Sequence, residues 1–487
     1  MSRVEAAAAT APAERLDRAT VLALVAMGVA VLVVAQDFTA LSVALPSIEK
    51  DLHADLGTVQ WTINAYALVF GVMIVTGGRL ADMFGRRRAF VLGAAIFAGF
   101  SVVGGAAQDT TWLIACRALM GIGGALMWPA ILGMTYAALP SSKAGLAGGL
   151  ILGAAGFGNA VGPLSGGLLT DELTWRWIFF VNLPIAAFGV AATLRAIKPD
   201  APAGEREPID YRGVAALSTG LVALLIALDQ STDWGWGDPR VLGLAVACGV
   251  LLVAFAVVER RMGESALVPR DVVGNRKFAA ACVTVLLMSA VFFATLLYLP
   301  QFMTKDLHYS ALRAGAGLLP MMGTFAAVSF AAGPLYERVG PKPVVSAGAL
   351  CCAVGVLLLS FLDSGDRYSA LLPGMFILGA GVGLFYSSVT TAGVTALDPA
   401  RASLAAGIVY MFQVAGGSVG LGVNTAIVTS GIGGSLSKFV DGIGDAFRVD
   451  AVLAFAATAV ALLFVGGRVS AAALRHHRPH LHRAHPG

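Results

Sequence analysis

The sequence predicts an all-α polytopic membrane protein, because its composition, its long apolar segments and the placement of its basic residues all favour that class. Of its 487 residues, 57% are hydrophobic and only 13% are charged. The mean hydropathy of +0.79 is too high, and the charge too sparse, for the surface of a soluble globular protein. The net charge of +4 is not gathered into a basic patch, so nucleic acid is not an expected partner.

Fourteen apolar segments are long enough to cross a bilayer as helices, which requires about 20 residues each. In chain order they cover 20–45, 58–78, 89–107, 112–138, 145–169, 177–197, 213–229, 240–258, 278–302, 312–335, 343–362, 370–396, 402–430 and 449–470. With the N-terminus inside, the inward segments carry 24 basic residues and the outward segments 8. Because Lys and Arg are retained on the cytoplasmic side, this bias predicts an even number of helices, with both termini cytoplasmic, in the cytoplasmic membrane.

Matches between the two ends of the chain indicate an internal repeat, which is common in transporters. The segment "GGRLADMFGR" from Gly77 matches "AGPLYERVGP" from Ala332 at an offset of 255, and "MGIGGALMW" matches "LGAGVGLFY" at 258. A third match, at 254, pairs Gly153, Gly162 and Gly166 with Gly407, Gly416 and Gly420. Three matches at nearly one offset predict two related six-helix bundles.

The repeat divides the chain into five parts and gives a 6 + 2 + 6 order of helices. These parts are a cytoplasmic lead (1–19), a first bundle (20–197), a two-helix insertion with its flanking segments (198–277), a second bundle (278–470) and a His- and Arg-rich cytoplasmic tail (471–487). The tail reads as a solvated basic segment, although its histidines leave metal binding open. The five cysteines lie in predicted helices without a C-x-x-C pair, so neither a disulfide framework nor a metal site is expected.

Two opposite charges lie inside predicted helices. Arg117 is five residues from Trp112, or about 7–8 Å deep, and Asp37 is roughly 12–13 Å from the outer end of its helix. An intramembrane arginine is costly and needs a partner, for which Asp37 is the candidate. A static salt bridge is one interpretation. The other is that movement of Arg117 loads and unloads a proton at Asp37, since a neighbouring cation controls the charge of a buried carboxyl group.

The second half has no acid at the equivalent position. Aligning Leu45-Pro46 with Leu299-Pro300 places Val291 opposite Asp37. We therefore expect proton chemistry in the first half and a mainly apolar or polar-neutral surface in the second.

The loop from Gly77 to Arg88 and the helix around Gly162 contain the remaining motifs. Glycine permits a tight turn in this loop. Retention of positive charge on the cytoplasmic side explains the arginines of the loop, but it does not explain why Asp82 has a repeat partner in Glu337. Glycines at i, i+4 and i+8, with a proline among them, allow close helix approach and a kink, although ordinary packing is an alternative. These residues are Gly158, Gly162, Pro163 and Gly166.

Neutral polar and aromatic residues in the predicted helices are candidates for the wall of a substrate cavity, or only for bonds between helices. They are Gln60, Trp61, Asn64, Asn159, Tyr298, Gln301, Tyr410 and Gln413.

Nearly the whole chain resembles the fourteen-helix drug:H+ antiporters of the major facilitator superfamily. "GGRLADMFGRRR" is similar to the loop 2–3 signature, "CRALMGIGGA" to the helix 4 motif and "GFGNAVGPLSGG" to the helix 5 antiporter motif, whereas "DFTALSVALP" and "WRWIFFVNLPI" are similar to segments of the fourteen-helix branch. The resemblance implies the major facilitator fold, antiport rather than uptake, and a cytoplasmic latch between the halves. The latch residues are Gly78, Asp82, Gly85, Arg86, Arg87 and Glu337.

The sequence thus predicts a proton-coupled exporter of lipophilic small molecules, cationic or weakly basic in the main, that works by alternating access. No phosphate loop, metal-ligand spacing or nucleophile constellation points to an enzyme, so the proton gradient replaces a cofactor as the energy source. The expected partners are substrate, protons and the lipid bilayer, and no protein partner is identified. An exporter of a dedicated lipid, amino acid or self-made antibiotic, and a non-transporting membrane receptor, remain as alternatives.

Overall fold

The computed structural model describes residues 18–466 apart from 55, 141–142, 201–210, 236, 263–267, 269–271, 273, 310 and 431–435. The predicted tail, and all but the last two residues of the predicted lead, lie outside the described residues. Every regular element in the described part is helical, as predicted. Within a bilayer a helix satisfies its own backbone hydrogen bonds, so apolar segments of this length form helices.

The first bundle contains six helical segments, the last of them divided in two. They are α2 (Arg18–Asp51), α3 (Leu56–Phe84), α4 (Arg86–Gly105), α5 (Thr110–Ala138), α6 (Ala144–Glu172), and α7 (Arg176–Phe180) with α8 (Asn182–Ala196). The predicted helix 177–197 is interrupted at Val181, because Pro184 has no N–H to donate to the carbonyl of Phe180.

The second bundle repeats this order after the inserted pair α9 (Tyr211–Trp234) and α10 (Pro239–Met262). Its elements are α12 (Arg276–Lys305), α13 (Ala311–Gly317), α14 (Leu319–Val339), α15 (Pro341–Leu359), α16 (Tyr368–Thr395), the short 3-10 helix η3 (Pro399–Arg401), α17 (Ala402–Ser430) and α18 (Leu436–Phe464). In the described part, thirteen stretches are long and apolar enough to cross a membrane, and α9 contributes a shorter apolar stretch, Arg212–Leu224. The arrangement confirms the predicted all-α membrane fold.

The last helix begins 13 residues before the predicted segment 449–470, so that boundary was wrong. The stretch from Lys438 to Asp450 contains five charged residues beside its apolar ones, which lowers its hydropathy to that of a loop. It is helical because its apolar residues recur on one face, where Val440, Ile443 and Phe447 are buried. Asp450 consequently lies well inside the helix and not at its end.

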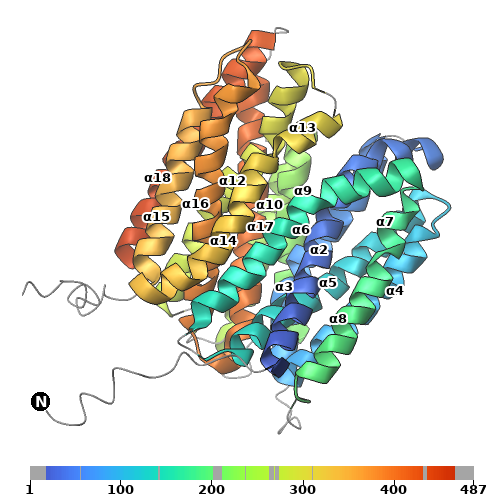
Figure 1. The fold of residues 1–487 in the computed structure, drawn as a ribbon, viewed down its shortest axis with the longest axis vertical. Coiled ribbons are helices and arrows are strands. Elements are labelled where there is room, and N and C mark those ends of the chain that lie inside the picture. The colour runs from blue at the N-terminus through green and yellow to red at the C-terminus, as the bar shows by residue number, and fades with distance from the viewer. Residues whose placement is uncertain are drawn as a thin grey trace, which may run out of the picture.

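The bundles meet mainly where α6 packs against α14 and where α3 packs against α17, and α6 with α16 and α5 with α17 add smaller contacts. Figure 1 shows the blue-to-green first bundle beside the yellow-to-red second bundle, with α6 running alongside α14. Helix α9 packs against both α3 and α17, whereas α10 packs mainly against α9. The outer face of α10 leaves Val246, Val250 and Val253 66%, 63% and 65% exposed, as expected for a helix that faces lipid.

Candidate functional site

Asp37 of α2 and Arg117 of α5 form an ion pair inside the first bundle. The Arg117 Nη1 atom lies 2.5 Å from the Asp37 Oδ2 atom, and Arg117 and Asp37 are 0% and 2% exposed, respectively. The structure therefore brings together the two charges that were paired by their estimated depths. A buried ion pair is favourable only when its remaining polar atoms are also hydrogen-bonded, so the surrounding groups decide whether these charges can coexist.

Asn182 is the second partner of Asp37, and sequence reasoning missed it. Its Nδ2 donates to Asp37 Oδ1 at 2.9 Å and to Ser101 Oγ at 3.1 Å, and Ser101 Oγ donates in turn to the Phe179 carbonyl at 2.8 Å. Asn182 is the first residue of α8, directly after the interruption at Val181. The signal was a lone amide in the apolar run "IFFVNLPIAAF", three residues after Phe179.

The rest of the Arg117 guanidinium is held by α3. Its Nε donates to the Thr62 carbonyl at 2.8 Å, and its Cζ lies 4.4 Å from the centre of the Tyr66 ring, a cation–π contact. The Nη2 atom is buried and has no hydrogen-bond partner among the described residues. Asp37 thus accepts from a cation at one oxygen and from an amide at the other.

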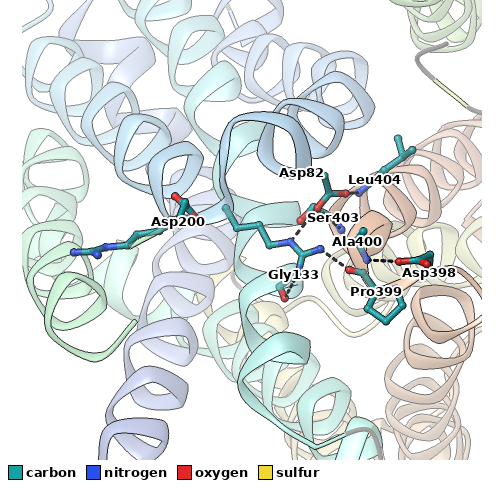
Figure 2. Close-up of polar contacts among 10 residues, drawn as sticks. Asp82, Gly133, Asp200, Asp398, Pro399, Ala400, Ser403 and Leu404 are labelled. Atoms are coloured by element: carbon teal, nitrogen blue, oxygen red, sulfur yellow. Dashed lines mark hydrogen bonds and ion pairs between the residues drawn. The ribbon is translucent and has the colours of Figure 1, made fainter. Parts of the chain in front are cut away.

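A second polar cluster joins the bundles at the end of the molecule where α3 ends and α17 begins, which we call the Gly85 end. Asp82 Oδ2 accepts from the Leu404 N–H at 2.9 Å and Oδ1 from the Ser403 N–H at 3.4 Å. Figure 2 shows Asp82 pointing at these two residues, which lie in the first turn of α17. Free N–H groups and the helix dipole make a helix N-terminus a site for negative charge.

Arg86 extends this cluster in three directions. Its Nε pairs with Asp82 Oδ1 at 2.9 Å, its Nη1 donates to the Gly133 carbonyl at 3.0 Å, and its Nη2 donates to the Pro399 carbonyl at 2.6 Å. Pro399 begins η3, directly before α17. A single guanidinium therefore connects α5, α3 and the second bundle (Figure 2).

Glu337, the repeat partner of Asp82, makes the reciprocal contact. Its Oε1 accepts from the Leu146 N–H at 3.0 Å, in the first turn of α6. Each acid thus lies at the end of a helix in one bundle and binds the start of a helix in the other. Gly78 and Gly333 permit the approach, since a Cβ atom would lie 2.5 Å from the Ser403 carbonyl oxygen at Gly78 and 2.6 Å from the Gly145 carbonyl oxygen at Gly333.

The turn between α3 and α4 requires its glycine. Gly85 has φ +106°, a conformation that other residues rarely adopt, and a Cβ there would collide with the side chain of Asp200. Asp200 accepts from the Arg87 and Arg88 N–H groups at 3.2 and 3.0 Å, so it caps α4. Arg87 Nη2 donates to the Leu194 carbonyl at 3.0 Å, so the described contacts of Arg87 do not cross to the second bundle. Sequence reasoning gave no role to Asp200.

The glycine face of α6 packs on α2 within the first bundle. A Cβ at Gly158 would lie 2.7 Å from the Leu32 carbonyl oxygen, and one at Gly162 would lie 2.9 Å from that of Gln36. Gly166 contacts the backbone of Ala40 in the same way. Pro163 lies within the same helix. Other glycines of α6, including Gly145, face the second bundle, so the helix presents small residues on two sides.

The packing of these glycines and of their repeat partners matches α2 to α12 at an offset other than the 254 given by the Leu-Pro pairs. In the first bundle Gly162 and Gly166 contact Gln36 and Ala40 of α2. In the second bundle Gly416 and Gly420 contact Leu286 and Ala290 of α12. Equivalent residues of α2 and α12 are therefore 250 positions apart. By this packing the counterpart of Asp37 is Leu287 and not Val291, one helical turn away. Neither residue is acidic. The sequence alignment missed this shift because it followed the Leu-Pro pair near the helix end.

The second bundle nevertheless contains a buried carboxyl group. Asp450 of α18 is 0% exposed. Sequence reasoning missed this group, because the predicted boundary at 449 placed Asp450 at the membrane surface.

The predicted cavity residues have different surroundings. The side chain of Gln60 lies outside the described part, and Tyr298 is buried with its hydroxyl donating to Thr425 Oγ1 at 2.6 Å, a bond within the second bundle. The Tyr410 ring lies 5.2 Å from that of Phe70 and 5.0 Å from that of Trp128, so it packs across the interface between the bundles. The half-buried remainder are Trp61, Asn64, Asn159, Gln301 and Gln413.

At the opposite end of the first bundle, Asp51 binds the segment before α7. Its Oδ2 accepts from Arg176 Nη1 at 2.5 Å and from Trp175 Nε1 at 3.1 Å. Arg176 also donates to the Ala107 carbonyl at 3.1 Å. The Arg176 guanidinium holds the pKa of the Asp51 carboxyl group below its ordinary value. These contacts join α2, α7 and the end of α4.

Comparison with known proteins gives three informative similarities. The family model described as Major Facilitator Superfamily matches residues 27–421. The puromycin resistance protein pur8 of Streptomyces alboniger is 35% identical over 88% of this chain and 84% of its own. The multidrug transporter protein MdtP of Bacillus subtilis is 31% identical over 83% of this chain and 74% of its own.

The fold is also similar to that of a solved structure, the human organic anion transporter MFSD10 (TETRAN). The match has a TM-score of 0.66 with 15% identity, and it covers 91% of this chain and 99% of the other. At this identity the similarity concerns the fold alone.

Proposed function

From the premise that this chain belongs to the Major Facilitator Superfamily and is a transporter and not an enzyme, we propose that it is a proton-coupled antiporter. It exports lipophilic, mostly cationic, drugs or antibiotics across the cytoplasmic membrane, with both termini in the cytoplasm. The observation that carries this proposal is the buried cluster of Asp37, Arg117 and Asn182. An ionisable pair inside a membrane bundle is costly unless it has a functional use.

The proton step follows from the balance of charges in this cluster. While Arg117 Nη1 contacts Asp37, the carboxylate is compensated and needs no proton. If the guanidinium moves away, the buried carboxylate loses its counter-ion and binds either a proton or a cationic substrate. Competition between these two for one carboxylate links proton entry to substrate exit. The gradient of protons supplies the energy, and no cofactor takes part.

The structure is consistent with one of the two states that alternating access requires. The hydrogen bonds of Asp82, Arg86 and Glu337 join the bundles at the Gly85 end. In the proposed orientation that end faces the cytoplasm, so these residues form a latch that closes the inner side. Opening inward requires all of these contacts to break, and the equilibrium follows their differential free energy.

Two substrate ranges are compatible with this site. The name of the Streptomyces alboniger relative specifies a single antibiotic, whereas that of the Bacillus subtilis relative specifies many drugs. Both have similar identity to this chain, so an exporter dedicated to one cargo, such as a self-made antibiotic, is the second candidate. The same coupling cluster serves either range.

A substrate panel in a drug-sensitive host tests the proposal. Cells that express the wild type are challenged with puromycin, ethidium and uncharged antibiotics, beside cells expressing Asp37→Asn. We expect resistance and energy-dependent ethidium efflux from the wild type and none from Asp37→Asn, at equal amounts of folded protein. Asp238→Asn, in the exposed turn between α9 and α10, is the matched control. Undiminished proton-driven efflux by Asp37→Asn would refute the coupling site.

A further inference from the structure

The second buried carboxyl group of the transporter, Asp450, has an environment opposite to that of Asp37. It lies 14 residues after Leu436, the start of α18, or about 21 Å along the helix. Its Oδ1 accepts from Asn424 Nδ2 of α17 at 3.0 Å, and the same Nδ2 donates to the Gly420 carbonyl at 2.9 Å. Two buried oxygens beside this bond, Asp450 Oδ2 and Asn424 Oδ1, have no hydrogen-bond partner in the described part of the chain.

No described cation compensates Asp450. Helix α18 packs against α12, α15 and α17, whose basic residues lie at the helix ends. These are Arg276, Lys277 and Lys305 on α12 and Lys342 on α15. On α18 itself Arg448 is 57% exposed and pairs with Asp445, whereas Lys438 and Asp441 lie further toward the helix start. The described contacts of Asp450 are limited to Asn424, and its Oδ2 atom has no partner among the described residues.

The other titratable groups on these helices are neutral or occupied. Tyr298 of α12 donates to Thr425, the residue after Asn424, and Tyr410 of α17 packs on Phe70 across the interface. The remaining groups are the thiols of Cys282 on α12 and of Cys351 and Cys352 on α15. A carboxylate at Asp450 would therefore be a buried charge whose only polar support among the described residues is one amide N–H.

The hydrogen-bond pattern calls for a proton on Asp450. An isolated buried carboxylate is so costly that it becomes neutral instead. A proton on Oδ2 also supplies the donor that the neighbouring Asn424 Oδ1 lacks, while Asn424 Nδ2 continues to donate to Oδ1. The acid and the amide then form a cyclic pair with two hydrogen bonds, and both unsatisfied oxygens are satisfied by one hydrogen atom.

We propose that Asp450 is a second proton carrier, protonated in this conformation and paired with Asn424, while Asp37 is ionised. This proposal rests on the proposed function. The step is the dissociation of the carboxylic acid into a carboxylate and one H⁺, with no other bond changed. Asn424 belongs to α17, whose N-terminus binds Asp82 and which packs against α3 of the first bundle. Movement of α17 when the latch opens separates Asn424 from Asp450 and exposes the acid for release.

Infrared spectroscopy of the purified transporter tests the protonation state without any substrate. At neutral pH the wild type is expected to have a protonated-carboxyl C=O band that Asp450→Asn lacks, and the difference between the two spectra isolates this band. Wild type minus Asp37→Asn is expected to show loss of carboxylate bands and serves as the internal comparison. Loss of carboxylate bands in the Asp450→Asn difference would overturn the proposal. Since the introduced amide can form the same cyclic pair with Asn424, the variant is expected to keep the wild-type melting temperature.

Proton counting tests the carrier role. The transporter is reconstituted in proteoliposomes with opposed pH and substrate gradients. The size of the pH gradient that stops net flux gives the number of protons per substrate. The substrate is puromycin, or the panel compound that is exported best. We expect Asp450→Asn to transport with one proton fewer per substrate than the wild type. A purely structural role predicts an unchanged number, which would overturn the proposal. If Asp37→Asn remains coupled, the proposed function fails while the infrared result for Asp450 still stands by itself.

Discussion

Replacing Asp82 by Asn is expected to open the Gly85 end of the transporter. The asparagine oxygen can still accept from the Leu404 N–H, but the negative charge at the start of α17 and the ion pair with Arg86 are lost. The Asp82 side chain is only 4% exposed, so solvent screens these interactions little. A charge in a partly buried position at a helix terminus is worth about 2 kcal/mol. That free energy corresponds to a change of about 30-fold in the ratio of closed to open molecules.

Electron paramagnetic resonance distances measure this ratio. Spin labels at Arg88→Cys and Ala400→Cys, both exposed positions on opposite bundles, are placed in a background without the five native cysteines. We expect a longer-distance population to rise in Asp82→Asn. Glu337→Gln is the matched comparison, and because Glu337 is exposed and accepts one hydrogen bond, its effect should be nearer about 2–5-fold. An unchanged distance distribution in Asp82→Asn would refute the latch.

Three further variants test individual contacts. Arg117→Ala is expected to shift the pH optimum of efflux, because Asp37 loses its counter-ion, and an unchanged pH profile would argue against the pair. Asn182→Ala removes one hydrogen bond to buried Asp37 and should lower the free energy of unfolding by about 1–3 kcal/mol. It should also alter the pH profile of efflux. An effect on the melting temperature alone would indicate a structural role. For Asp51 the folded-state pKa is lowered by Arg176, so its stabilising contribution is present above the unfolded-state pKa and is lost as the pH falls through the folded-state pKa. The melting temperature of Asp51→Asn should accordingly lie below that of the wild type at neutral pH and converge with it in acid, and a constant difference would contradict this assignment.

The features that sequence reasoning predicted well depend on regular geometry. Asp37 and Arg117 could be paired from sequence because each residue of a helix rises by a fixed distance, so depth follows from position. The repeat likewise identified Glu337 as the partner of Asp82. It could not show that the two acids bind helix starts in opposite bundles, since that contact depends on how the bundles pack.

The features that were missed depend on helix boundaries and on single neutral side chains. Asp450 escaped notice because the charges between Lys438 and Asp450 resemble a loop in hydropathy, although the segment is an amphipathic part of α18. Asn182 was missed because a lone amide in a membrane helix most often has only a packing role. The counterpart of Asp37 was misplaced by one turn, since sequence alignment does not record the register in which α12 packs on α17.

The reciprocal contacts of Asp82 and Glu337 have a consequence for how the two bundles separate. Asp82 of the first bundle binds the start of a helix in the second, and Glu337 of the second bundle binds the start of a helix in the first. The same pattern of reciprocal contacts occurs in an isologous interface, where a twofold axis relates two identical subunits. In such an interface one rotation breaks both contacts at once, so neither bundle can open by itself. The pair is therefore expected to behave as a single cooperative closure, in which weakening either half lowers the barrier for both.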